Sequence, residues 1–314
     1  MRHPTAVVSM TCLLALAGVA RGQDNTDDGA DAGRAPVFRL NLRGLHYFSA
    51  DLDEDATDSG DVSVSRFGPL ASLEIPIGEV SSITIAGEFT YSFYDFDGTG
   101  LFEDDNELLS DAYELGLSAT WSSRLGDEWT YFIGGGGRLS AESGADTSDA
   151  LTARVFGGLG YRVSDQFTIG AGVGVSTELD DDVLVVPFLS AFYQINDDWW
   201  FGAGGGPAAA GRTLGATLTW QAQPDLGVSL TGAWDRREFR LADDGPIPDG
   251  IATDSRVDVV LGVNWGVVDR VTLRVEAGAS VWQEYEFEDE DGDEVLDTGT
   301  DPSAFVGASI GFEF

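Results

Sequence analysis

The sequence predicts an all-β protein, a transmembrane antiparallel up-and-down β-barrel of fourteen strands. Three observations lead to this fold class. Apolar and polar residues alternate with a period of two beyond residue 37, and no segment shows the 3.6-residue period of a helix. Short and long connections follow one another in turn, and aromatic residues gather beside the short ones. Short turns at one end and long loops at the other are typical of membrane barrels.

The chain begins with a segment that has the composition of a secretory signal. Arg2 supplies a positive charge, residues 6–20 form an apolar stretch, and Ala20-Arg21-Gly22 offers a cleavage site. We therefore expect a signal peptide at 1–22, a disordered acidic leader at 23–36 and the barrel at 37–314. No other stretch reaches the length of an apolar membrane helix, so any membrane residence would be through strands.

The overall charge is strongly acidic. The chain has 54 Asp and Glu residues against 17 basic ones, all of which are Arg, and its formal net charge is −37. Nucleic-acid binding needs a basic surface, so we expect no nucleic-acid partner. The only cysteine is Cys12, within the predicted signal, which leaves the mature chain without a disulfide or a thiolate metal site.

The connections set the strand count. Turn-forming Gly, Asp, Asn or Pro residues occupy six short connections, at 75–82, 123–129, 162–167, 194–200, 221–227 and 266–271. Seven longer ones, mostly acidic and polar, lie at 50–61, 95–107, 141–149, 179–182, 204–211, 241–255 and 286–302. Together they join fourteen strands. Twelve or sixteen strands stay as alternatives for two reasons. Pro69 and Pro187 fall inside strands, where each proline needs a bulge or marks the point where strand pairing begins. The ninth strand is also short.

The alternation also indicates which face is apolar. In one strand Val271, Leu273 and Val275 share a face, and Arg274 and Glu276 lie on the other. Fourteen strands enclose a lumen too wide for side chains to fill, and the sequence contains no insert to plug it. We therefore expect the apolar faces to point outward into lipid, with closure of the barrel satisfying the backbone hydrogen bonds.

Aromatic residues flank the short connections on the expected outer face. Such a belt is typical of the membrane–water interface. The predicted girdle consists of Trp121, Trp129, Tyr161, Phe167, Tyr193, Trp199, Trp220, Trp265 and Phe314.

The last strand carries a family resemblance. Residues 304–314, AFVGASIGFEF, alternate strictly and end on Phe314, and so resemble the closing strand of a bacterial outer-membrane β-barrel. Residues 37–314 as a whole resemble a porin-like barrel, although no specific family is identified. The resemblance implies residence in the cell outer membrane, contact with outer-membrane lipid, and delivery to the barrel-assembly machinery, which would recognise this strand.

Ionisable residues on the inward faces are the candidate pore-lining set. Several fall at similar heights in the wall, where mixed signs resemble the charged constriction of a porin. An ion-pair network that stiffens the wall or closes the lumen explains the same pattern equally well. We expect Glu114 to pair with Arg138. The set is Arg39, Arg43, Glu88, Glu114, Arg138, Arg154, Arg256, Asp258, Arg274 and Glu276.

One acidic connection resembles a calcium loop. Asp289, Asp291, Asp293 and Asp297 lie within residues 286–302, but Gly292 precedes the third Asp, which departs from the EF-hand pattern. A solvated acidic loop is the alternative. Apart from this possible calcium ion we expect no cofactor.

Catalytic residue sets are absent from the sequence. The mature chain has one histidine, His46, on the outward parity, and the glycine runs do not open a helix as a phosphate-binding loop would. An enzyme of the lipase, protease or deacylase type is therefore not expected. The first functional hypothesis is a passive channel for small polar solutes or ions. The alternative is a closed structural or surface-interaction barrel whose acidic loops bind cations or partners.

Overall fold

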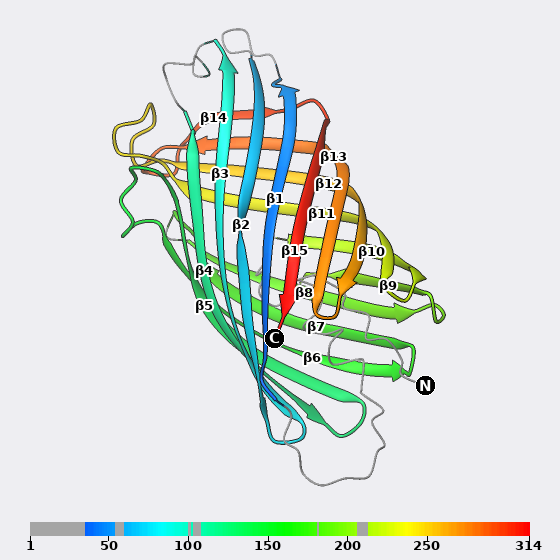
Figure 1. Ribbon diagram of the computed structural model, residues 1–314. Helices are drawn as coiled ribbons and strands as arrows, with labels where there is room; N and C mark the ends of the chain where they lie inside the picture. The colour runs from blue at the N-terminus through cyan, green and yellow to red at the C-terminus, as the bar shows by residue number, and fades with distance from the viewer. Residues whose placement is uncertain (1–34, 54–59, 100–101, 103–107, 181, 206–212) are drawn as a thin grey trace.

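The computed structural model describes residues 35–53, 60–99, 102, 108–180, 182–205 and 213–314. Within them fourteen antiparallel strands form a closed barrel, which confirms the predicted fold class and excludes the twelve- and sixteen-stranded alternatives. A fifteenth strand, β14, lies inside the predicted connection 286–302 (Figure 1). The predicted signal peptide (1–22) lies outside the described residues, as does the predicted leader (23–36) except for its last two residues.

The strands are bounded as follows: β1 Val37–Asp51, β2 Gly60–Ile77, β3 Ser81–Gly98, β4 Asp111–Leu125, β5 Trp129–Glu142, β6 Leu151–Ser164, β7 Phe167–Thr177, β8 Val183–Gln194, β9 Trp199–Gly204, β10 Thr213–Gln223, β11 Leu226–Arg240, β12 Ile251–Val268, β13 Val271–Glu288, β14 Glu294–Gly299 and β15 Ser303–Glu313. We call the end of the barrel with the short connections the turn end, and the opposite end the loop end. Left-handed glycines at Gly78 (φ 64°) and Gly126 (φ 69°) make two of the tight turns at the turn end.

The barrel closes between its first and last strands. β1 pairs with β15 from Arg39 opposite Glu313 to Tyr47 opposite Phe305. Phe38 and Phe314 also exchange backbone hydrogen bonds, at 3.2 and 2.8 Å. The first and last strands therefore meet along most of their length, and the ring has no free edge at this seam.

The two prolines occupy places where the ladder can do without a donor. Pro187 faces Val173 of β7, while the described part of β9 pairs with β8 only from Ser190 onward. The first described pair with β9, Ser190 with Gly204, lies three residues beyond Pro187. Pro69 pairs with Leu42 of β1, and the β2–β3 ladder is interrupted beside it without a shift of register. No bulge is needed at Pro69.

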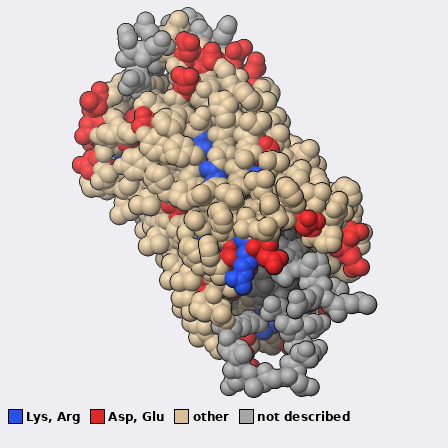
Figure 2. All heavy atoms as spheres, viewed as in Figure 1, with Lys and Arg blue, Asp and Glu red and all other residues tan. Residues whose placement is uncertain are grey.

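Large apolar side chains point outward from the wall, as predicted. Leu189 is 75% exposed and Leu117 is 64% exposed, in keeping with a surface that faces hydrocarbon rather than a core. On the face shown in Figure 2, acidic residues gather towards the ends of the barrel and the band between them carries few charged atoms. None of the described residues belongs to a helix long and apolar enough to cross a membrane.

Four inward-facing glycines each face a phenylalanine on the next strand. The pairs are Gly134 with Phe156, Gly158 with Phe132, Gly172 with Phe188, and Gly278 with Phe305. A Cβ atom at each of these glycines would lie 2.3–2.7 Å from the partner's ring. The rings therefore lie over bare backbone, and Phe132, Phe156 and Phe188 form a buried cluster of their own.

At the loop end the sheet forms a second, smaller ring. Above the barrel proper, β11, β12, β13 and β14 run across the lumen towards the opposite wall (Figure 1). β11 reaches β5 through a parallel bridge between Arg240 and Ala141. At the other side Leu52 bridges Thr300, and Asp53 N–H donates to the Gly299 carbonyl at 3.0 Å. Among the described residues, β1–β5 and β11–β14 thus close a ring of nine strands, which we call the small ring.

A β-bulge redirects one of these strands. The β12–β13 register shifts between Val257 and Asp258, which leaves an extra residue at Val281–Trp282. Both of these side chains face outward, and beyond them Gln283, Tyr285 and Phe287 face the inside of the small ring. A bulge bends its strand, and here β13 also exchanges its partner β15 for β14.

Side chains fill the small ring. Eight or nine strands enclose an interior about as wide as packed side chains, whereas fourteen do not. The expectation of an unfilled lumen is therefore wrong for the loop end. The buried apolar residues there are Tyr47, Leu52, Val62, Val64, Tyr94, Phe102, Leu108, Leu109, Ala112, Phe239, Leu241, Ile247, Ala252, Val260, Tyr285, Phe287 and Phe305.

Candidate functional site: the two sides of the lumen

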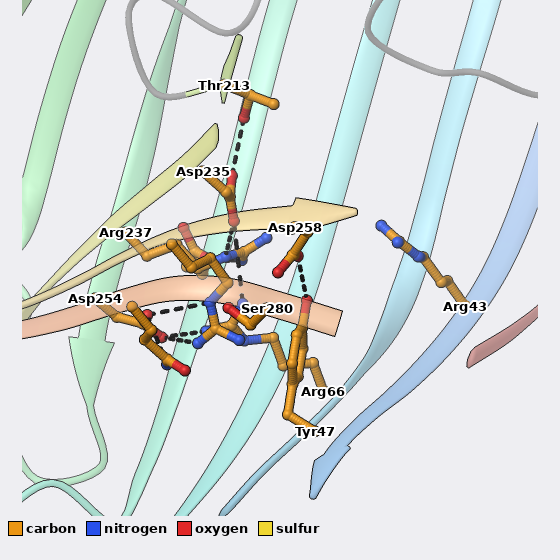
Figure 3. Close-up of polar contacts among 12 residues, drawn as sticks. Arg43, Tyr47, Arg66, Thr213, Asp235, Arg237, Asp254, Asp258 and Ser280 are labelled. Atoms are coloured by element: carbon orange, nitrogen blue, oxygen red, sulfur yellow. Dashed lines mark hydrogen bonds and ion pairs between the residues drawn. The ribbon is translucent and has the colours of Figure 1, made fainter. Parts of the chain in front are cut away.

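A charged layer forms the floor of the small ring. Arg66 of β2 and Arg256 of β12 both donate to the Asp254 carboxylate, which also accepts from the Tyr94 hydroxyl at 3.0 Å (Figure 3). Gln283 adds a fourth contact to Asp254 at 3.3 Å. Arg256 is 0% and Asp254 is 1% exposed. Charges this deeply buried are stable only when paired, and Asp254 holds both guanidiniums inside the small ring.

The layer continues across to the opposite wall. Arg138 Nη1 donates to Glu114 Oε1 at 2.8 Å, the pairing expected from the sequence, and Arg138 Nη2 reaches Glu88 at 2.5 Å. Arg237 of β11 pairs with Glu114 from the other side and donates to Asp235 at 2.9 Å. Strands β3, β4 and β5 are thus connected to β11 by ion pairs that cross the lumen beside the Arg240–Ala141 bridge.

The remaining predicted pore residues lie nearer the turn end, except Asp258 and Arg154. Asp258 belongs to the layer and accepts from the Tyr47 hydroxyl at 2.9 Å. Arg43 and Arg274 donate to Glu276 at 2.9 and 2.8 Å, and Arg39 contacts Glu313 at 2.9 Å and Glu74 at 3.3 Å. Arg154 is half-buried on β6, opposite Gly136 of β5.

Arg66, Asp235, Arg237 and Asp254 are the members of the layer that sequence reasoning missed. Residues 241–255 were interpreted as one connection, but β12 begins at Ile251, which places Asp254 inside a strand. Arg66 shares its parity with Val62 and Val64, which resembles an outward apolar set. All three in fact face the packed small ring. The sequence did contain one sign of this burial: Arg66 lies on the same strand face as two valines, where a lipid-facing strand would not place a charge.

The other side of the lumen, along β6–β10, is different. These five strands are shorter, from 6 to 14 residues, and contribute nothing to the small ring. Inward residues of β7 and β8 keep partial exposure; they are Gly170, Gly172, Ser176, Leu184, Val186, Ser190 and Phe192. We call this the β6–β10 side. On β7 and β8 it is lined mainly by small and apolar residues, whereas β10 contributes inward Thr213, Thr217 and Thr219 and β6 contributes Arg154.

Strand β8 is apolar on both faces. Outward Val183 and Val185 are 63% and 59% exposed, while Leu184, Val186 and Phe192 face the lumen and are half-buried. The Phe132–Phe156–Phe188 cluster packs between them. A strand that separates lipid from water would be expected to alternate, so the inner face of β8 is suited to contact with apolar groups.

The predicted calcium loop is held by its own backbone. The Asp289 carboxylate accepts from the N–H groups of Asp291 and Asp293, both at 3.0 Å, around a left-handed Gly292. Asp297 lies on β14, opposite Glu286. The described residues contain no group of three or more His, Cys, Asp or Glu arranged to hold a metal. Calcium binding at Asp289, Asp291, Asp293 and Asp297 stays a prediction.

The aromatic residues beside the short turns lie in contact in pairs on the outer face, stacked in Trp199–Trp220, tilted in Trp129–Tyr161 and edge-to-face in Phe167–Tyr193. Ring centroids lie 4.7 Å apart for Trp129–Tyr161, 5.9 Å for Trp199–Trp220 and 6.0 Å for Phe167–Tyr193. Trp121, Trp265 and Phe314 are exposed there as well. His46 faces outward higher on β1, where its Nδ1 lies 2.9 Å from the Ser65 hydroxyl.

Several solved structures are similar to this chain. A FadL homologue from Pseudomonas aeruginosa aligns with a TM-score of 0.52 and 13% identity, over 88% of this chain and 90% of that one. The likeness establishes the fold alone. The toluene transporter TodX from Pseudomonas putida gives a TM-score of 0.48 at 10% identity, over 90% of each chain. An outer-membrane channel from Pseudomonas putida F1 gives 0.45 at 10%, over 92% of this chain and 100% of that one. No protein-family model matches the chain, and no curated protein matches it.

Proposed function

We propose that the chain is an outer-membrane channel for small solutes, with its turn end in the periplasm and its loop end outside the cell. The exposed apolar wall needs a hydrocarbon partner, and the aromatic pairs beside the short turns suit the membrane–water interface as a girdle. β15 would be the strand that the barrel-assembly machinery recognises. The shared fold with a solved barrel protein agrees with this proposal.

The solutes would be small and largely apolar, and the inner face of β8 carries this part of the proposal. Leu184, Val186 and Phe192 face the lumen without being fully covered, although the lipid lies on the other side of the strand. An apolar surface that lines a lumen gains free energy when an apolar solute displaces water from it, about 25 cal/mol per Å² covered. Passage would follow the β6–β10 side, since the small ring is packed.

Two other functions have observations in their favour. Passage of polar solutes or ions is supported by the exposed charges towards the turn end, Arg39, Arg43 and Glu74. A closed structural barrel is supported by the filled small ring and its charged layer. Enzymatic activity has no such support.

Uptake measurements on matched variants separate these functions. Whole cells that carry the chain in their outer membrane would be given a labelled neutral aromatic solute or a labelled sugar of similar size. Val186→Asn, on the inner face of β8, should reduce uptake of the aromatic several-fold, while Val185→Asn, on the outer face, should not. Faster uptake of the sugar, together with discrete ion-conducting steps in planar bilayers, would favour the polar channel. Uptake no faster than in cells without the chain, with silent bilayers, would favour the closed barrel.

A further inference from the structure

Two connections of the β6–β10 side, at 143–150 and 178–180, dock against the outer face of the small ring. Along β11, residues of one parity (Asp235, Arg237, Phe239) face into the small ring. Residues of the other parity (Arg236, Glu238, Arg240) face away from it, towards the β6–β10 side. Glu238 and its cross-strand neighbour Thr253 are nevertheless buried. The outer face of the small ring is therefore itself an interface.

Arg240 is the centre of this interface. Its guanidinium donates to the carbonyl oxygens of Asp149, between β5 and β6, at 3.4 Å, and of Asp249, between β11 and β12, at 2.7 Å. It also donates to the carbonyl oxygen of Leu179, between β7 and β8. One side chain thus fastens three connections, and it lies at the Arg240–Ala141 bridge where the small ring closes.

A second contact reinforces the first. Arg236 reaches the Glu178 carboxylate at 3.8 Å while it pairs with Glu238 at 3.0 Å. The Glu178 contact is long, and Arg236 is partly exposed, so it adds little stability. Beyond these polar contacts, Ala150 and Leu179 are the apolar residues that these two connections bury, and most of residues 143–149 is exposed.

The small ring is fastened in a different way. In its charged layer Arg66 and Arg256 pair with Asp254, all three side chains being at most 4% exposed, and two bridged seams close the ring. Opening it would leave buried charges unpaired, which is costly. Releasing the connections at 143–150 and 178–180 requires that the carbonyl oxygens of Asp149 and Leu179 exchange Arg240 for water, that the long Arg236–Glu178 contact is lost, and that Ala150 and Leu179 become exposed. Segments with few buried contacts open first.

We propose that the connections at 143–150 and 178–180 form a gate over the β6–β10 side, held shut by Arg240, while the small ring stays closed. This rests on the proposed function and adds the position of the outer exit: beside β11, off the barrel axis. A solute would leave between the outer face of the small ring and these connections. The hydrogen bonds of Arg240 hold the gate closed, and the contact between Arg236 and Glu178 contributes less.

Thiol labelling tests the gate without any transported solute. The only cysteine, Cys12, lies in the predicted signal, so an introduced cysteine would be unique in the mature chain. Ser190→Cys places the reporter on the inner face of β8, and Ser176→Cys provides a second reporter on β7 should the first not fold. Ser92→Cys is the matched control, because Ser92 faces the small ring at 0% exposure.

Each reporter would be combined with Arg240→Ala and treated with a membrane-impermeant maleimide from outside the cell. Arg240→Ala should raise the labelling rate of Ser190→Cys about tenfold, because hydrogen bonds from a charged donor are lost. Arg124→Ala, the same change near the turn end, should leave the rate unaltered. Heat-modifiable mobility on a detergent gel would confirm that each variant is folded.

Two results would overturn the gate. One is an unchanged labelling rate of Ser190→Cys and Ser176→Cys in folded Arg240→Ala. The other is labelling of Ser92→Cys, which would mean that the small ring opens instead. Failure of the proposed function gives a different result, because the gate would then open to the maleimide in a chain that takes up no solute.

Discussion

Arg240 of β11 and Ala141 of β5 form a parallel β-bridge, although five strands separate them along the barrel wall. The bridge divides the loop end of the lumen into a nine-stranded ring and the β6–β10 side. A nine-stranded ring is narrow enough for its own side chains to fill. The division therefore explains how one barrel can be packed on one side and keep partly exposed lining residues on the other.

Loss of the Arg66–Asp254 pair should destabilise the barrel strongly. Arg66→Met leaves the buried Asp254 carboxylate with one guanidinium fewer, at a cost of about 3 kcal/mol. Arg39→Met, which breaks the exposed contact with Glu313, should cost about 0–1 kcal/mol. Urea unfolding in detergent micelles, followed by tryptophan fluorescence, measures both. Equal midpoints would show that the charged layer does not hold the small ring together.

Substitution of a glycine beneath a phenylalanine ring should be costly as well. In Gly172→Ala the new Cβ would lie 2.3 Å from the Phe188 ring, so the ring must move, at a cost of about 1–3 kcal/mol. Gly232→Ala adds the same methyl group at a position with no atom within 4 Å and should be neutral or stabilise slightly, by up to about 1 kcal/mol. The same unfolding assay compares the two. Similar midpoints would argue against close Phe–Gly packing.

The connection at 241–250 should show a pH-dependent contact. A hydrogen bond with Asp243 raises the pKa of Asp249, the charges of Asp243 and Glu290 act in the same direction, and Arg240 opposes them. A raised pKa means that the folded chain holds this proton more tightly. The contact is therefore at full strength below the usual pKa of an aspartate and is lost as the pH rises through the raised value.

Carboxyl carbon chemical shifts in an NMR titration would test this. Asp249 should titrate above the ordinary aspartate range in the wild-type chain. In Asp243→Asn its pKa should fall, because the carboxylate charge beside it is gone. An Asp249 carboxyl that titrates alike in both chains would contradict the pairing.

Sequence patterns were sufficient for the barrel but not for the small ring. Alternation, turn asymmetry and the last strand predicted the fourteen strands and the β1–β15 seam. The similar heights of Glu114 and Arg138 in the wall predicted their ion pair. Each of these features involves only strands that are adjacent in the barrel. The Arg240–Ala141 bridge joins strands that are distant both in the chain and around the wall, so no local pattern reports it.

At the loop end apolar side chains face inward, and one residue in the sequence indicated this. Phe305 belongs to the parity of Ser309 and Glu313, which is the inward face of β15. An aromatic on a polar face indicates an apolar interior at that height. On β13 the bulge at Val281–Trp282 hides the same change, because Tyr285 and Phe287 keep the odd numbering of the outward residues below. A bulge that shifts the register cannot be recognised from periodicity alone.

The packed small ring also constrains the shape of anything that could cross the protein. Its interior is filled by buried side chains, so under the proposed function a solute would pass along the β6–β10 side. A stiff, rod-like polymer that enters at the turn end would meet the Arg66–Asp254–Arg256 layer and stop. Under the proposed function, a compact molecule would instead pass along β8. The protein should therefore select among molecules by their stiffness and length first, and by their polarity second.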